Sequence, residues 1–134
     1  MDKQKLIPFF SFTGNAEEAM NFYADTLPGA EIASIERFGK DEAFGDEGKI
    51  LTGILTIGGQ QIMFLDMQPA YPAPAFSWAA SFILRCADEA EFDEVFRQLS
   101  QGGAVMMGPE PVRQFRKAAW VTDRFGITWQ PVWE

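Results

Sequence analysis

The 134-residue sequence contains no histidine and only one cysteine, Cys86. Histidine is the commonest metal ligand in proteins and the only side chain whose ordinary pKa lies near neutrality. A metal site or a base of near-neutral pKa would therefore have to be built from carboxylates, amides and one thiol. A single cysteine also excludes a disulfide within the chain, which is typical of a reducing compartment.

Positive charge and long apolar runs are scarce as well. The chain has 11 Lys and Arg against 19 Asp and Glu, so its formal net charge is −8. Nucleic acids and anionic membranes bind basic surfaces, and we expect neither as a partner. No stretch approaches the roughly 18 apolar residues of a membrane span. The opening residues MDKQKLIPFFSF lack the apolar segment and cleavage site of a signal peptide, so we expect a cytoplasmic protein.

The residues that are present predict the same order of elements twice: a strand, a helix and three strands. The first copy has a helix that we expect Asn15 to cap and Pro28-Gly29 to end, and expected strands at Leu6–Phe12, Glu31–Phe38, Lys49–Ile57 and Gln60–Asp66. The second copy has a helix that we expect Asp88 to cap and Gly102-Gly103 to end. Its expected strands are Trp78–Cys86, Ala104–Met107, Phe115–Thr122 and Ile127–Trp133, with a Pro-rich bend at 108–112.

An internal repeat supports this division. Shifting the sequence by 73 residues (88 − 15) places Asn15 on Asp88, Gly29 on Gly102 and Ile32 on Val105. A repeat of this length indicates two copies of one small unit. We therefore predict one α+β domain over residues 1–134, with a βαβββ unit at 1–66, a Pro-rich linker at 67–77 and a second unit at 78–134. Paired units would form a curved mixed sheet with the helices on its convex face and a pocket on its concave face.

Several segments resemble one known group. They are PFFSFTGN at 8–15, AEEAMNFY at 16–23, the turn GGQ at 58–60, Ser81-Phe82, and WVTDRFGITWQ at 120–130. Together with the paired βαβββ units, they resemble the vicinal oxygen chelate superfamily of glyoxalase I, extradiol dioxygenases and bleomycin- and fosfomycin-resistance proteins. Within it, the chain is similar to the PhnB-like branch, which is often labelled "3-demethylubiquinone 3-methyltransferase domain".

The resemblance implies four metal-ligand positions, on the first and last strands of each half, which hold His, Glu or Gln in the metalloenzymes. Strand alternation places Ile7 (or Pro8), Met63, Ser81 and Gln130 at these positions. Two of the four side chains are apolar, one is a hydroxyl and one is an amide. Zinc requires N, S or carboxylate ligands and hard cations require several oxygens, so we expect no metal and no cofactor.

Other chemistry finds little support in the sequence. No Gly-rich loop joins a first strand to a helix in the way that S-adenosylmethionine binding would need. Without a histidine partner Cys86 would be a poor nucleophile, and its place in the strand favours core packing. Asp66 and Asp123 end strands, where an aspartate is either a turn former or a candidate general base.

The hypothesis that follows is a metal-independent small-molecule binding protein with an apolar or aromatic ligand. The candidate ligand-binding residues are Phe9, Met63, Ser81, Arg85, Trp120 and Gln130. Aromatic rings with a few polar groups are typical of ligand pockets, but the same rings could fill the cavity and leave a purely structural role. The alternative is a lyase, isomerase or transferase that uses Asp66 or a Glu of the Gly39–Gly48 loop as a base. The resemblance also implies a homodimer.

Overall fold

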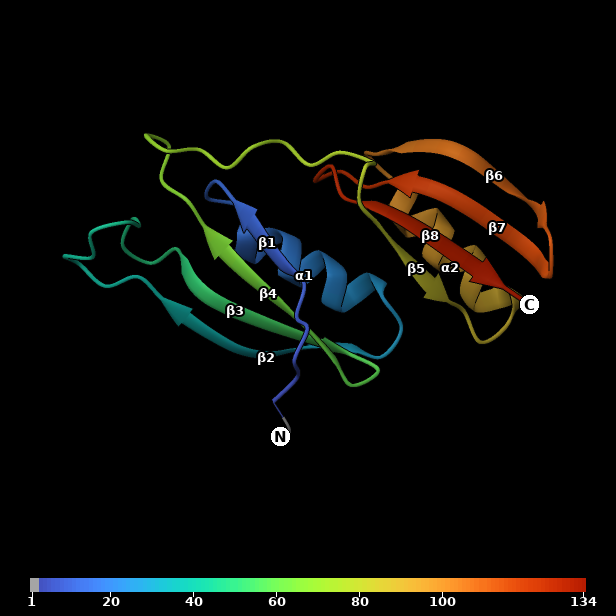
Figure 1. Ribbon diagram of the computed structural model, residues 1–134, viewed down its shortest axis with the longest axis horizontal. Helices are drawn as coiled ribbons and strands as arrows, with labels where there is room; N and C mark the ends of the chain where they lie inside the picture. Colours follow the sequence, from blue (N-terminus) through green and yellow to red (C-terminus); the bar gives the residue numbers. More distant parts are fainter. Residues whose placement is uncertain (1–2) are drawn as a thin grey trace. The chain divides into compact units, whose positions relative to one another are not determined.

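Each half of the chain builds a four-stranded sheet with one helix packed against it (Figure 1). The computed structural model describes residues 3–134. The chain divides into two compact units, one that ends at Pro74 and one that spans Ala75–Glu134. The boundary therefore lies inside the Pro-rich segment at 67–77.

The first unit follows the predicted order of elements. These are β1 (Phe9–Phe12), α1 (Ala16–Thr26), β2 (Ala30–Arg37), β3 (Ile50–Ile57) and β4 (Gln60–Asp66). The strand order is β1-β4-β3-β2, in which β1 and β4 are parallel and the other neighbours are antiparallel. Gly58 and Gly59 join β3 to β4 with φ of +53° and +84°. This left-handed turn explains the glycine pair, because other residues rarely adopt such φ values.

The second unit repeats this arrangement. Its elements are β5 (Ser81–Arg85), α2 (Glu89–Ser100), β6 (Ala104–Val112), β7 (Phe115–Thr122) and β8 (Thr128–Trp133). The strand order is β5-β8-β7-β6, again with the first and last strands parallel. Gly29 and Gly102 end the two helices with the same φ of +74°. The predicted α+β class with two βαβββ units is confirmed.

The two helices begin in different ways. Asp88 caps α2 as predicted, because its Oδ1 accepts a 2.8 Å hydrogen bond from the Glu91 amide. Asn15 occupies the N-cap position of α1, but its side chain makes no capping hydrogen bond. The Ala16 amide donates instead to Asp66, which is 50 residues away in the sequence. The prediction that the Asn15 side chain caps this helix was therefore wrong.

Three strands differ by more than one residue from their predicted ends. β1 begins at Phe9 and β5 at Ser81, three residues later than expected in each case. β6 continues to Val112 through the Pro-rich residues 108–112, where a bend was expected. The two prolines are tolerated because β6 lies at the edge of its sheet, and its pairing with β7 shifts register three times along its length.

Each core lies between a sheet and its own helix. In the first unit Phe10 and Phe12 contact Phe64, with ring centroids 5.6 Å and 5.8 Å apart, and Phe64 lies 6.2 Å from Tyr23 of α1. In the second unit the ring centroids of Phe82 and Trp129 are 5.5 Å apart. Phe10, Phe12 and Phe82 thus lie on the helix-packed side of β1 and β5, and the alternate residues of these strands must point to the other face.

No helix within residues 3–134 combines the length and the apolar character that crossing a membrane requires.

A glycine on β3 permits close packing of α1. A Cβ built on Gly53 would overlap the sulfur and methyl group of Met20. We predict that Gly53→Ala lowers the free energy of unfolding by about 1 kcal/mol, because the buried end of the Met20 side chain would have to move within a packed core. Gly39→Ala is the matched control, since its Cβ would make only ordinary contacts with Glu42. Urea denaturation of both variants tests this, and unchanged stability of Gly53→Ala would contradict it.

Candidate functional site

A row of side chains crosses the sheet of the first unit on the face away from α1. Phe9 pairs with Met63, Met63 pairs with Ile54, and Ile54 pairs with Ser34. We call these four residues the Met63 row. Phe9 is 52% exposed although it is a large aromatic side chain. Two of the predicted site residues, Phe9 and Met63, are therefore direct neighbours.

An equivalent row crosses the sheet of the second unit. Ile83 pairs with Gln130, and Met107 pairs with Trp120. The register of β7 and β8 is the same on both sides of Trp120, so it places Trp120 opposite Gln130. We call Ile83, Gln130, Trp120 and Met107 the Gln130 row. It sets one neutral amide between two apolar side chains, of which Ile83 is 60% exposed.

The Gln130 amide is held by a neighbouring strand. Its Nε2 donates a 2.7 Å hydrogen bond to Oγ of Ser81 on β5. Ser81 pairs with Thr128 in the sheet, and the Thr128 hydroxyl lies 2.9 Å from the hydroxyl of Thr122. The polar groups beside the row are thus hydroxyls and an amide, and they carry no charge. Ser81, Gln130 and Trp120 from the predicted set share this face.

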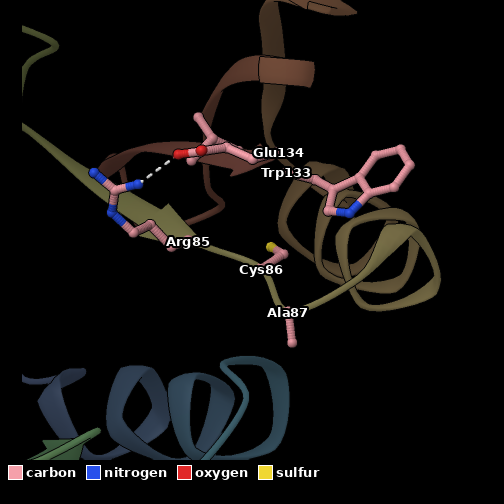
Figure 2. Close-up of a pocket in the computed structure, with 6 residues that line it drawn as sticks. Arg85, Cys86, Ala87, Trp133 and Glu134 are labelled. Atoms are coloured by element: carbon pink, nitrogen blue, oxygen red, sulfur yellow. Dashed lines mark hydrogen bonds and ion pairs between the residues drawn. The ribbon is translucent and has the colours of Figure 1, made fainter. Parts of the chain in front are cut away.

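Arg85 lies apart from this polar pair. Its Nη1 is 2.9 Å from Oε1 of Glu134, and both side chains are more than half exposed. The ion pair borders an open pocket of about 240 Å³ at the ends of β5 and β8, lined also by Cys86, Ala87, Val132 and Trp133 (Figure 2). A surface ion pair of this kind contributes little to stability. Its importance here is that the Arg85 guanidinium already has a carboxylate partner.

Cys86 is a buried thiol, in agreement with the predicted core position. Burial raises the pKa of its thiol to about 11, and the negative charge of Glu91 adds to the effect. The thiolate is the nucleophilic form of cysteine, so Cys86 is poorly suited to covalent catalysis at neutral pH.

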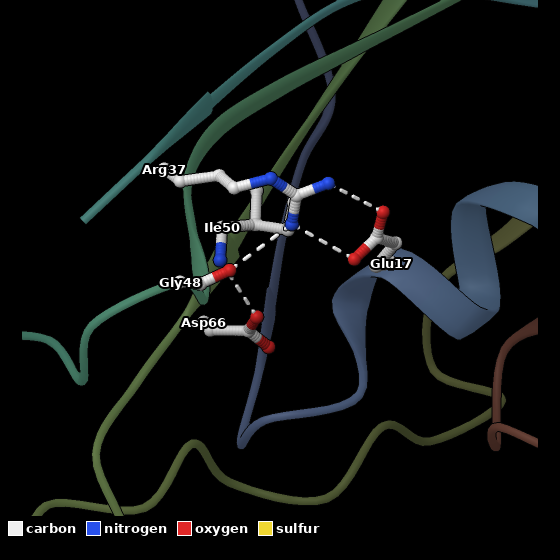
Figure 3. Close-up of polar contacts among 5 residues, drawn as sticks. All are labelled: Glu17, Arg37, Gly48, Ile50 and Asp66. Carbon is white, nitrogen blue, oxygen red and sulfur yellow. Dashed lines mark hydrogen bonds and ion pairs between the residues drawn. The ribbon is translucent and has the colours of Figure 1, made fainter. Parts of the chain in front are cut away.

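Asp66 ties three parts of the first unit together. Its Oδ1 accepts 2.9 Å hydrogen bonds from the amides of Gly14 and Ala16, and its Oδ2 accepts a 3.0 Å bond from the amide of Ile50. Figure 3 shows the Asp66–Ile50 bond, with an Arg37–Glu17 ion pair beside it. The carboxylate is 2% exposed and both of its oxygens are occupied. This arrangement suits a structural role and not a general base.

The neighbouring ion pair joins β2 to the first turn of α1. Both terminal nitrogens of Arg37 contact Glu17, and Nη1 also donates to the carbonyl oxygen of Gly48 (Figure 3). The hydrogen bonds from Arg37 lower the pKa of the Glu17 carboxyl. Glu17 therefore stays ionised and is committed to this contact.

Asp123 has the corresponding role in the second unit. Its Oδ1 accepts from the amides of Phe125 and Ile127, and its Oδ2 accepts a 2.9 Å bond from Nε1 of Trp129. Asp123 is buried, like Asp66. Of the two interpretations of these strand-ending aspartates, the geometry favours the turn former.

The residues present do not fit the metal site that the resemblance implies. Ser81 and Gln130 are bonded to each other, Met63 offers a thioether in a row of apolar side chains, and Ile7 precedes β1. Hard cations require several charged or carbonyl oxygens. Residues 3–134 contain no group of three or more His, Cys, Asp or Glu side chains that could hold a metal ion.

Four members of the rows, Ser34, Ile54, Ile83 and Met107, were not among the predicted site residues. Ser34, Ile54 and Met107 lie on strands where alternation alone did not single them out. Only the register between strands shows that they extend the rows, and register is not visible within one strand's sequence. Ile83 follows Ser81 by two positions, so alternation alone places it on the same face, and it is exposed.

The bonds to Asp66 generate a prediction about stability. Asp66→Asn keeps the shape of the side chain but replaces one acceptor oxygen with an N–H donor, which would face a backbone amide. We predict a loss of about 2–3 kcal/mol in the free energy of unfolding, because a buried amide would lose a partner that carries a charge. Asp25→Asn, on the exposed surface of α1, is the control and should change little. Equal denaturation midpoints for the two variants would contradict this role.

The raised pKa of Cys86 generates a second prediction. The folded-state value of about 11 lies above the ordinary value of 9.0. At neutral pH the thiolate fraction should therefore be about a hundredfold lower than in the unfolded chain. We expect iodoacetamide to alkylate the native protein at least that much more slowly, with a rate that rises until the pH passes about 11. Mass spectrometry of timed samples measures this, and rates that match in native and urea-unfolded protein would refute it.

Comparison with known proteins places this geometry in a family. The sequence matches the family described as 3-demethylubiquinone-9 3-methyltransferase over residues 4–132. The structure is similar to the PhnB protein from Bacillus cereus, with 35% identity, a TM-score of 0.88 and coverage of 98% of this chain and 100% of that one. It is also similar to protein PA1353 from Pseudomonas aeruginosa, with 30% identity, a TM-score of 0.85 and coverage of 98% of both chains.

A more distant likeness extends to the glyoxalase and bleomycin-resistance fold. The fosfomycin resistance protein FosX from Mesorhizobium loti is 14% identical, with a TM-score of 0.61 and coverage of 98% of this chain and 92% of that one. At this identity the likeness shows the fold alone. A search of curated proteins found no match. From the match over nearly its whole length, the chain belongs to the PhnB-like 3-demethylubiquinone-9 3-methyltransferase family.

Proposed function

We propose that this protein binds an apolar or aromatic small molecule without the help of a metal ion. The observation that carries the proposal is the Gln130 row. It presents a neutral amide between Ile83 and Trp120, at one of the positions where the resemblance implies a metal ligand. A site of apolar side chains with one or two fixed polar groups is the usual composition of a small-molecule site.

The Met63 row supports the same proposal independently. Its Phe9, Met63 and Ile54 side chains form an apolar strip on the face away from α1, and Phe9 keeps half of its surface exposed. Exposed rings that adjoin other apolar side chains favour a ligand or a partner that covers them. The resemblance adds a homodimer to this proposal, and the features of the sequence add a cytoplasmic location.

Within residues 3–134, the glycine pair at 58–59 gives no support to the methyltransferase description of the family. Gly58 and Gly59, a pair that a nucleotide-type loop would place between a strand and a helix, lie in the hairpin between two antiparallel strands. Their backbone is committed to a tight turn. Transfer of a methyl group is therefore not the activity that we propose.

The two aspartates that could act as a general base, Asp66 and Asp123, already have structural roles. Asp66 and Asp123 are buried and accept three hydrogen bonds each, from backbone amides and an indole N–H. A general base needs a free lone pair within reach of the substrate proton. The glutamates of the 39–48 loop lie in an exposed segment and no described contact directs them at either row.

The proposal predicts how the purified protein responds to chelation and to ring removal. We expect no stoichiometric metal by elemental analysis and a melting temperature that EDTA leaves unchanged. A naphthalene-based probe such as 2-naphthol should raise the melting temperature by mass action. Phe9→Ala should weaken its affinity by about fivefold to tenfold, because one aromatic contact is lost. The matched control is Phe44→Ala, which removes an exposed ring from the 39–48 loop and should leave the affinity unchanged.

One bound metal per chain, with loss of thermal stability on chelation, would refute the proposal. Equal effects of Phe9→Ala and Phe44→Ala would remove Phe9 from the binding surface.

A further inference from the structure

We infer that the Gln130 row selects uncharged ligands: planar ring compounds that carry a carboxamide or lactam group, in preference to carboxylates of the same shape. This inference rests on the proposed function and adds to it the chemical class of the ligand. Three observations carry it, namely the position of the amide, its remaining hydrogen-bonding groups and the state of the nearby arginines.

The position of the amide requires a ligand with an apolar body. Gln130 lies between Ile83 on β5 and the residue opposite it on β7, Trp120, and Met107 continues the row on β6. An indole ring and two aliphatic or thioether side chains bind flat hydrocarbon surface by burial and ring contact. A ligand that lies on this row therefore brings its polar group to the centre, where the amide is.

The hydrogen-bonding groups left at this centre match an amide. Gln130 uses one Nε2–H on Ser81 Oγ, which leaves a second N–H and the acceptor Oε1. The Ser81 hydroxyl keeps its own O–H to donate. The residues that the structure describes give Oε1 no hydrogen-bond partner. A ligand carboxamide would accept from Nε2 or Ser81 through its C=O and donate to Oε1 through its N–H.

The charges around the row disfavour a carboxylate. Arg85 is on β5 two positions after Ile83, but its guanidinium is paired with Glu134. Arg116 is on β7 four positions before Trp120, and its guanidinium lies over the Trp133 ring, 5.2 Å from the centroid. Both arginines are thus engaged, and the protein carries a formal charge of −8. An anion on the row would lose water without gaining a free cation.

The test compares 2-naphthamide with 2-naphthoate, which share a ring system and differ in charge at neutral pH. Isothermal titration calorimetry on the full chain should give the amide an affinity at least about tenfold higher, since one well-placed hydrogen bond has roughly that effect. Gln130→Met keeps the length of the side chain and removes both amide functions. It should reduce the affinity for 2-naphthamide by about tenfold and change that for 2-naphthoate little.

Two further variants distinguish a loss of ligand selectivity from a general loss of folded structure. Ser81→Ala removes the hydroxyl partner with minimal change of shape and should also reduce the amide preference. Gln114→Met, in the exposed turn between β6 and β7, makes the same chemical change elsewhere and should leave both affinities as they are. Thermal melts of each variant establish that it is folded before titration.

The outcomes distinguish the inference from the function beneath it. Preference for 2-naphthamide that both Gln130→Met and Ser81→Ala reduce supports the inference. Binding of the two probes with equal affinity, or a preference that survives Gln130→Met, overturns the inference and leaves the proposed binding function standing. Failure of both probes to bind the folded protein overturns the two together.

Discussion

The Asp66 carboxylate is the contact on which the first unit depends. It stands at the end of β4 and binds the amides of Gly14 and Ala16, where β1 turns into α1, and the amide of Ile50, where β3 begins. Three segments that are distant in the sequence are therefore fixed at one buried point. A carboxylate can do this because it offers two oxygens and a negative charge to the positive end of the helix. An uncharged side chain would leave at least one of the amides without a partner.

Asp123 fixes the second unit in a similar way, and this determines where Gln130 points. The aspartate holds the turn before β8 through two backbone amides and binds the indole N–H of Trp129. Trp129 is thereby held on the buried face, against Phe82. Successive residues of a strand point to opposite faces, so Gln130 must point to the face away from α2. The candidate site is thus a consequence of a buried hydrogen bond one residue away.

Much of this fold could be predicted from the sequence because its signals are local. Helix faces, glycine stops and the hairpin at Gly58-Gly59 each depend on residues within a few positions. The internal repeat gave the same order of elements in both halves, so each half supported the prediction for the other. Three features could not be predicted locally. The cap of α1 comes from Asp66, the length of β6 depends on its place at the sheet edge, and the two rows depend on register between strands. Alternation could assign Phe9 and Ser81 to a face, but it could not show which residues of other strands lie beside them.

The same distribution of polar groups explains why binding is a better interpretation than catalysis. The carboxylates that a reaction would need are buried in Asp66 and Asp123, where hydrogen bonds from the protein already satisfy them. The polar groups that adjoin the Gln130 row are an amide and hydroxyls, which do not exchange protons near neutral pH. Neutral groups can still recognise a ligand, since their hydrogen bonds have direction and cost little desolvation. The proposed binding function therefore needs no proton transfer, because an exposed isoleucine, a tryptophan and one fixed amide supply both apolar contact and directed hydrogen bonds.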